Sequence, residues 1–254
     1  MEYFFLVLGL LIGSFLNVVI YRLPLEKSIV SPGSACPSCN TRLKPMDNIP
    51  VFSFLFLKGR CRYCKAPISV RYPLIEGLTA LVTVLVFLVV GLSWSLLFHL
   101  VAVYVLIAVF FIDLEHMIIP DSLVVVLLVN AILYVVIVRE VPFLDAGIGF
   151  LAASLPLFLI AWATKGGLGG GDIKLMAAMG VFLGWKSILL SLLIGCVLGA
   201  LVSLGLMVFK KKKKKDLIPF GPFLCMGIVI AMFYGEVIIQ WYLRLSGIIY
   251  VNIF

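Results

Sequence analysis

Residues 96–113 read LLFHLVAVYVLIAVFFID, an apolar run that ends on a carboxylate, Asp113. Runs of about 20 apolar residues are long enough to cross a bilayer as a helix. A charge on such a helix is costly, by roughly 2.5 kcal/mol or more, and by default marks a functional site. The stretch therefore predicts a membrane helix that carries an acidic group to one membrane face.

A second carboxylate, Asp172, follows the triplet Gly169, Gly170 and Gly171 at the head of another apolar segment. Two carboxylates at one membrane face can share a proton and act as an acid/base pair. The simpler alternative is that each aspartate caps a helix at the interface. We expect the glycines to allow unusual backbone dihedral angles and the close approach of a substrate strand. A phosphate cradle at this turn is the weaker alternative, because the carboxylate would repel an anion.

The composition is that of an integral membrane protein. Of the 254 residues, 63% are hydrophobic and 13% are charged, whereas roughly a quarter are charged in soluble proteins. The mean hydropathy is +1.22. We therefore predict an all-α polytopic membrane protein with about eight transmembrane helices, or seven if the short sixth segment is not a span. The segments lie near residues 3–20, 74–91, 95–112, 122–138, 144–163, 173–185, 187–209 and 223–243.

The positions of the lysines and arginines reflect the orientation of the chain in the membrane. The net charge of +8 could suggest nucleic acid binding, but all 20 lysines and arginines except Arg139, Lys186 and Arg244 fall on one side of the predicted membrane. This skew is the positive-inside signature. It predicts a protein of the cytoplasmic (inner) membrane that contacts the lipid bilayer and no nucleic acid, with both aspartates on the cytoplasmic side. The lysine run at 210–215 is expected to bind anionic lipid.

Two C-x2-C pairs lie 21 residues apart in the first loop: Cys36 and Cys39, then Cys61 and Cys64. Four thiolates at this spacing suit a tetrahedral structural zinc ion. Because this loop is assigned to a reducing compartment, disulfides are the weaker alternative. The loop is rich in proline and short, so the metal would supply most of its folding energy. We predict three parts: a first transmembrane helix (1–20), a small zinc-binding cytoplasmic loop (21–72) and a helical bundle (73–254).

The sequence also predicts specific contacts for three other polar residues. Asp121 precedes an apolar run and is expected to be a helix N-cap; it is also the substitute if the first carboxylate is not catalytic. Glu76 lies near the inner end of its segment, where an ion pair with Arg71 or Arg22 is expected. Asn17, in the first apolar segment, is expected to form a hydrogen bond between helices.

The chain resembles the bacterial type IV prepilin peptidases, also called prepilin leader peptidase/N-methyltransferases. Besides the two cysteine pairs, the matching stretches are GSFLNVVIYRLP (13–24), RYPLIE (71–76), FIDLEHMIIPD (111–121), GGGDIKLMAAMG (169–180) and IPFGPF (218–223). They run from the first helix to the last, so the resemblance covers nearly the whole chain.

The resemblance implies an aspartic protease of the GxGD type with its active site on the cytoplasmic side. Asp113 and Asp172 would be catalytic, and the residues expected to shape the site are Gly169, Gly170, Gly171, Asp121, Pro219 and Gly221. The substrates would be prepilins and pseudopilins of type IV pilus or type II secretion systems, cut after a glycine that precedes an apolar helix. The resemblance also implies methylation of the new N-terminus with S-adenosylmethionine, through cofactor contacts that the motifs do not identify.

The sequence is also compatible with two alternative functions. The first is a peptidase without methyl transfer, because family members that lack the cysteines exist. The second is a transporter that moves protons or cations through its membrane carboxylates. It is less favoured because both carboxylates lie at one face, whereas transporter sites usually lie near the bilayer midplane.

Overall fold

The computed structural model describes residues 1–165, 167–208 and 218–245. The regular structure of these residues is helical; they include two isolated β-bridges but no strand, as the all-α prediction requires. The chain divides into two compact units, Met1–Ile112 and Asp113–Phe254, called unit 1 and unit 2 below. The helix α4 begins in the first unit and ends in the second.

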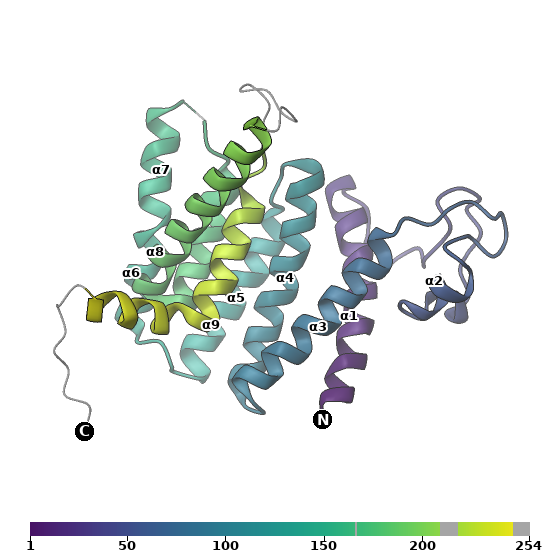
Figure 1. Ribbon diagram of the computed structural model, residues 1–254, viewed down its shortest axis with the longest axis horizontal. Coiled ribbons are helices and arrows are strands. Elements are labelled where there is room, and N and C mark those ends of the chain that lie inside the picture. The colour runs from purple at the N-terminus through teal and green to yellow at the C-terminus, as the bar shows by residue number, and fades with distance from the viewer. Residues whose placement is uncertain (166, 209–217, 246–254) are drawn as a thin grey trace. The chain divides into compact units, whose positions relative to one another are not determined.

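In unit 1, two long helices pack side by side (Figure 1). The elements of this unit are α1 (Glu2–Arg22), η1 (Leu23–Leu25), η2 (Pro45–Asn48), α2 (Phe52–Phe56), α3 (Arg71–Val90) and the greater part of α4 (Trp94–His116). The loop between α1 and α3 holds only short turns of helix, as its many prolines predict.

The close packing of α1 on α3 depends on glycine. A β-carbon on Gly9 or Gly13 would lie 2.5 Å or 2.7 Å from Cα atoms of α3. These glycines form a G-x-x-x-G pattern, which allows two membrane helices to approach closely. One turn further along, Asn17 Nδ2 donates to the carbonyl of Tyr72 at 3.2 Å, which confirms the expected bond between helices.

Unit 2 is a bundle built around one long helical element. Its helices are α5 (Asp121–Ile137), α6 (Phe143–Ala152), α7 (Ser154–Ala163), α8 (Gly170–Val208) and α9 (Gly221–Leu245). The central element α8 packs against each of the other four (Figure 1). At its crossing with α6, Gly149 and Gly180 meet backbone to backbone, so that neither position has room for a side chain.

The 39 residues of α8 would form a straight helix of about 58 Å, far longer than the roughly 30 Å hydrocarbon core. The helix is broken at Gly184, where φ is +74° and ψ is 171°. A positive φ of this kind is accessible to glycine and is strained for other residues. Gly184 therefore separates a short first half of α8 from a longer second half.

Contacts with α9 show that the chain reverses at this break. Gly199 lies against the ring of Phe223 near the start of α9, whereas Ser187 lies against Gly235 further along it, so the second half of α8 runs antiparallel to α9. The first turn of α8 also lies close to the start of α9, through the carboxylate of Asp113. Both ends of α8 are thus brought to the same end of unit 2.

In the described part of the chain, six helices are long and apolar enough to cross a membrane, and α5 is a shorter apolar helix of 17 residues. Each predicted span coincides with helix. However, 173–185 and 187–209 fall in the single element α8, and 144–163 is divided into α6 and α7. The count of eight transmembrane helices is therefore not confirmed.

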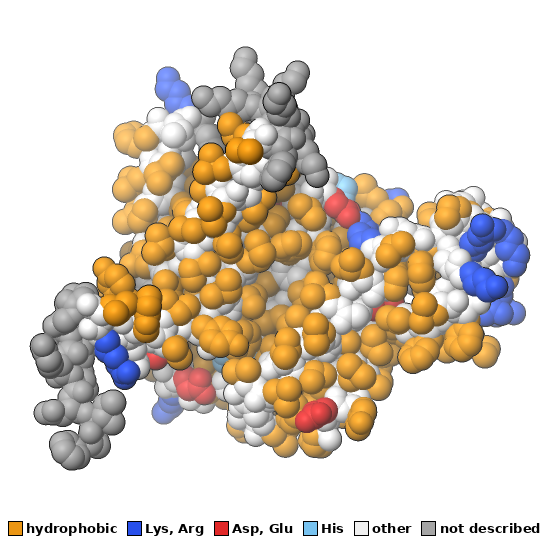
Figure 2. All heavy atoms as spheres, viewed as in Figure 1, with side chains coloured by type: hydrophobic (Ala, Val, Ile, Leu, Met, Phe, Trp, Pro, Cys, Tyr) orange, Lys and Arg blue, Asp and Glu red, His pale blue; other side chains and the backbone are white. Residues whose placement is uncertain are grey.

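The surface matches a chain in contact with lipid. Figure 2 shows hydrophobic side chains over most of the visible helical surface and lysine and arginine side chains over the loop that contains α2. Large apolar residues such as Tyr3 and Trp162 are 85% and 75% exposed, which suits a hydrocarbon solvent rather than water. The lysine run at 210–215 lies outside the described residues.

Candidate active site and metal centre

The two aspartates singled out in the sequence lie together in unit 2. Asp113 is in the last turn of α4 and Asp172 in the first turn of α8; they are 6% and 8% exposed. Their carboxylates are close enough to interact electrostatically. Among the described residues of unit 2, no other acidic side chain is buried. The fold therefore concentrates two carboxylates at one place, which is the requirement for an acid/base pair.

The start of α9 completes this site. The backbone N–H of Gly221, its first residue, donates to Asp113 Oδ2 at 3.0 Å, and a β-carbon here would lie 2.6 Å from the same oxygen. Pro219 is half-buried just before the helix. One turn into α9, the thiol of Cys225 is 3% exposed and within electrostatic range of both carboxylates. The sequence offered no signal that this cysteine borders the site.

The backbone of the glycine triplet differs from the sequence-based prediction. None of Gly169, Gly170 and Gly171 has a positive φ, so the predicted unusual dihedral angles are wrong. The structural reason for glycine is instead space: a β-carbon on Gly171 would lie 2.8 Å from the Cβ of Ile119, and one on Gly169 would lie 3.1 Å from Asp172 Oδ2. Gly170 has open space around it. Two of the three glycines thus let the α4–α5 connection and a carboxylate pack closely.

Asp121 is neither an N-cap nor a member of the buried pair. It is the first residue of α5, Pro120 occupies the N-cap position, and no side-chain capping bond is formed. Both of its oxygens instead bind Lys174 Nζ, at 2.7 and 2.9 Å. The side chains of Asp121 and Lys174 are 70% and 55% exposed. The N-cap prediction is therefore wrong, because a lysine one turn into α8 competes successfully for the carboxylate.

In unit 1, the four predicted cysteines form one cluster. Their sulfur atoms all lie within 4.8 Å of one another, and Cys36 Sγ is 3.8 Å from Cys64 Sγ. All four are free thiols. The backbone gives each pair the same turn: the N–H of Cys36 and of Cys61 donates to the carbonyl five residues on, at 3.0 and 2.8 Å. The predicted ligand set therefore has the arrangement needed to hold a metal ion.

The four thiols differ in acidity. A hydrogen bond with Thr41 lowers the pKa of Cys39 to about 6, and the backbone N–H groups of Cys64 and Tyr63 lower the pKa of Cys61. The backbone N–H of Ala66 acts to lower the pKa of Cys64, but loss of solvation and the neighbouring thiols raise it to about 11. Four thiolates this close repel one another, and a bound cation removes that repulsion.

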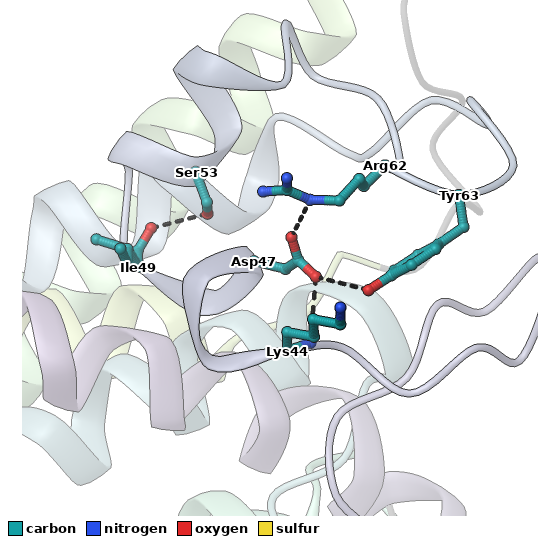
Figure 3. A network of polar contacts seen from close by, with 6 residues as sticks. All are labelled: Lys44, Asp47, Ile49, Ser53, Arg62 and Tyr63. Atoms are coloured by element: carbon teal, nitrogen blue, oxygen red, sulfur yellow. Dashed lines mark hydrogen bonds and ion pairs between the residues drawn. The ribbon is translucent and has the colours of Figure 1, made fainter.

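A buried aspartate joins the second cysteine pair to the rest of the loop (Figure 3). The carboxylate of Asp47 is 2% exposed. It accepts from the backbone N–H of Lys44 at 3.1 Å, from Arg62 Nε at 2.6 Å and from the Tyr63 hydroxyl at 3.3 Å. Arg62 and Tyr63 are the two residues between Cys61 and Cys64, so this network fixes the turn that presents two of the sulfur atoms. No local sequence motif indicates this network.

The expected ion pair of Glu76 with an arginine is not found. The carboxylate instead accepts the backbone N–H of Val51 at 2.7 Å and a hydrogen bond from the Ser14 hydroxyl. The contact joins α3 to the loop through a backbone group, which sequence charge patterns do not reveal.

Comparison with known proteins places this architecture in a family. A model described as the Bacterial Peptidase A24 N-terminal domain matches residues 7–90, and one described as the Type IV leader peptidase family matches residues 100–204. A prepilin leader peptidase/N-methyltransferase of Aeromonas salmonicida (strain A449) is 41% identical, over 92% of this chain and 91% of the relative. The chain belongs to the type IV leader peptidase family.

Other relatives agree with this family membership. Proteins of the same name from Legionella pneumophila and Pseudomonas aeruginosa are 38% and 34% identical, and the matches cover 95% of this chain and 95% and 93% of the relatives. No solved structure matches the chain significantly. With its apolar helices, this leader peptidase family member is a multi-pass protein of the inner membrane.

Proposed function

We propose that this protein is a membrane aspartic endopeptidase that removes the leader peptide of type IV prepilins and pseudopilins, cutting after glycine at the cytoplasmic membrane face. The buried meeting of Asp113 and Asp172 is the observation that carries the proposal. The positive-inside charge distribution supports the cytoplasmic side. Family membership supports the substrate class. It gives no support to the alternative of a proton- or cation-coupled transporter.

In this proposal the two carboxylates have different roles. Two adjacent carboxylates cannot both ionise cheaply, so one of them keeps a proton. The N–H of Gly221 is a fixed donor to Asp113, and such a donor favours the ionised form. Asp113 therefore activates the attacking water, and the protonated Asp172 polarises the scissile carbonyl. Of the glycines beside the pair, Gly170 has open space around it, and the substrate backbone would approach there.

The loop at 21–72 is the structural metal module in this proposal, and the metal is zinc. A tetrahedral ion with Zn–S bonds of about 2.3 Å separates its sulfur ligands by about 3.8 Å. The 3.8 Å between Cys36 Sγ and Cys64 Sγ fits that geometry, and all four sulfur atoms lie within 4.8 Å. We assign to this same N-terminal part, with α1 and the start of α3, the methylation of the new N-terminus with S-adenosylmethionine.

A cleavage assay on a purified prepilin, with the protein in detergent or liposomes, tests the proposal. Asp113→Asn and Asp172→Asn preserve side-chain size and remove one carboxylate each. Either change should abolish cleavage, by a factor of about 10⁴ or more, because neither aspartate can replace the other's role. Glu236→Gln, which removes an exposed carboxylate from α9, is the matched control and should cleave normally.

The same variants identify a wrong assignment. Cleavage that persists in either asparagine variant would overturn the catalytic pair. Transfer of a labelled methyl group to the mature N-terminus is measured in parallel on the unaltered protein. Cleavage without methyl transfer would favour the peptidase that has no second activity.

A further inference from the structure

Unit 1 contains two buried carboxylates, and the fold uses them differently. The structure describes every residue of this unit. Asp47 accepts hydrogen bonds from the three donors of the loop network. Glu76, 8% exposed, accepts only from Val51 and Ser14 among the described residues. Since a carboxylate can accept about four hydrogen bonds, Glu76 keeps capacity for another donor.

The backbone that Glu76 holds is strained. Val51 has φ +61° and ψ −49°, and the N–H of Phe52 donates to the carbonyl of Pro50 at 2.6 Å, which closes a tight γ-turn. A positive φ is unfavourable for a β-branched residue, and this form of γ-turn is rare. Such backbone persists where its surroundings enforce it, and it gathers at active sites and ligand clamps. The bond from Val51 to Glu76 is one of those enforcing contacts.

The same junction of α1 and α3 holds a buried acceptor without a donor. Asn17 is 2% exposed and its Nδ2 donates to two backbone carbonyls, but its Oδ1 has no partner in the described residues. Gly13, which accepts one of these bonds, packs directly on the Glu76 backbone, so both side chains belong to one cluster. An unmet buried acceptor destabilises the fold, and a ligand N–H would remove that cost.

We propose that Glu76 is the catalytic residue of methyl transfer, and that its carboxylate binds the α-ammonium group of the newly cut pilin and takes its proton. This rests on the proposed function, which requires a methyl-transfer site outside the peptidase pair. A carboxylate with unused capacity to accept hydrogen bonds suits a cationic amino group, which brings N–H donors. Asn17 Oδ1 supplies a second acceptor in the same cluster, so the chemistry of the available groups fits a ligand that brings N–H donors.

The chemistry balances with these groups. An α-amino group has a pKa of about 8 and is mostly protonated at neutral pH, when its nitrogen has no free lone pair. Transfer of one proton to Glu76 frees that pair. S-adenosylmethionine, when bound, supplies a methyl group on a positively charged sulfur. The N–C bond forms as the C–S bond breaks, the bonding electrons return to sulfur, and Glu76 later releases its proton to water.

Glu76→Gln in the full-length protein separates this role from a structural one. The glutamine carbonyl can still accept the N–H of Val51, so the loop is retained while the base is removed. We expect prepilin cleavage and zinc content to remain normal and methyl transfer to a mature pilin to fall by about 100-fold or more. Glu26→Gln, which removes an exposed carboxylate at the start of the same loop, is the control and should methylate normally.

The pH profile of the residual methylation gives an independent readout. Without Glu76, only the neutral fraction of the amine reacts, so the rate should rise about tenfold per pH unit until about pH 8. The groups that face Glu76, the Ser14 hydroxyl on α1 and the Val51 amide in the loop, do not titrate in this range.

Two outcomes would overturn the proposal. The first is that the Glu76→Gln variant methylates the mature pilin at the same rate as the unaltered protein. The second is loss of zinc together with loss of methylation, which would make Glu76 a support for the loop; in that case Glu76→Asp, which keeps the charge, should not restore transfer either. Failure of the proposed function is recognised separately, because the unaltered protein would then fail to methylate or to cleave.

Discussion

The backbone N–H of Gly221 donates a 3.0 Å hydrogen bond to Asp113 Oδ2, joining residues that are 108 positions apart in the sequence. The bond places the first turn of α9 directly on the carboxylate that we assign as the base. Only a residue without a side chain allows this approach, because a β-carbon at position 221 would lie 2.6 Å from the oxygen.

Gly221→Ala should therefore impair cleavage while the bundle still folds. The added methyl group must displace the carboxylate of Asp113, and displacement of a reacting group by about 1 Å can cost about 100-fold in rate. The measurement is kcat for prepilin cleavage, with thermal unfolding of the variant as a test of folding. Gly147→Ala is the control, since a β-carbon there meets nothing within 4 Å. Equal activity of the two alanine variants would refute the positioning role of Gly221.

Asp121→Ala should leave most of the cleavage activity, within about threefold of normal, because the ion pair that it loses is exposed and such pairs are worth about 0–1 kcal/mol. The released Lys174 remains solvated by water. The test is the initial rate of cleavage at low and at moderate salt. Abolished cleavage with an intact fold would mean that Asp121, and not Asp113, is the first catalytic carboxylate.

Cys36→Ser should release the metal, because three thiolates and a hydroxyl bind zinc far more weakly than four thiolates. Without the ion, the short loop lacks the energy to keep its turns. Metal analysis of the purified protein and limited proteolysis within residues 21–72 measure the two effects. Cys196→Ser changes a cysteine of α8 outside the cluster and should retain the metal. A full complement of zinc in Cys36→Ser would argue against a four-cysteine site.

Local pattern was enough to predict the helices and the pairing of the two aspartates. The apolar runs identify the helices because lipid requires long segments that satisfy their own backbone. Asp113 ends one run and Asp172 begins another, so a strict alternation of direction brings both carboxylates to one face. Similarly, each C-x2-C turn holds its own two sulfur atoms close together. A single metal ion with four sulfur ligands then requires the two turns to lie side by side.

The remaining features depend on contacts between distant segments. The hydrogen bond from Gly221 and the bond from Val51 to Glu76 are made by backbone groups, which leave no trace in charge or hydropathy. The reversal of α8 depends on one positive φ at Gly184. Hydropathy divides this stretch into the segments 173–185 and 187–209, but a single glycine is common in membrane helices and does not reveal the backbone dihedral angles at which the chain turns.

Asp47→Asn should weaken the loop at neutral pH and lose this effect in acid. Burial acts to raise the pKa of Asp47, but the bonds and charge of Arg62, the N–H of Lys44 and the Tyr63 hydroxyl together lower it below its usual value. A carboxyl group with a depressed folded pKa stabilises the fold above its unfolded pKa of about 3.9, and this contribution disappears as the pH falls through the folded value.

The rate of zinc loss to a chelator measures this contribution, because Asp47 holds the turn between Cys61 and Cys64. Zinc should leave Asp47→Asn about 10-fold faster than the unaltered protein at pH 7. The ratio of the two rates should begin to fall below about pH 4 and reach one once Asp47 is protonated in the folded protein. Using the ratio cancels the protonation of the cysteines, which affects both proteins alike. A ratio of one at pH 7 would show that the carboxylate does not support the metal site. A ratio that stays high in acid would show that the hydrogen bonds, and not the charge of Asp47, hold the turn.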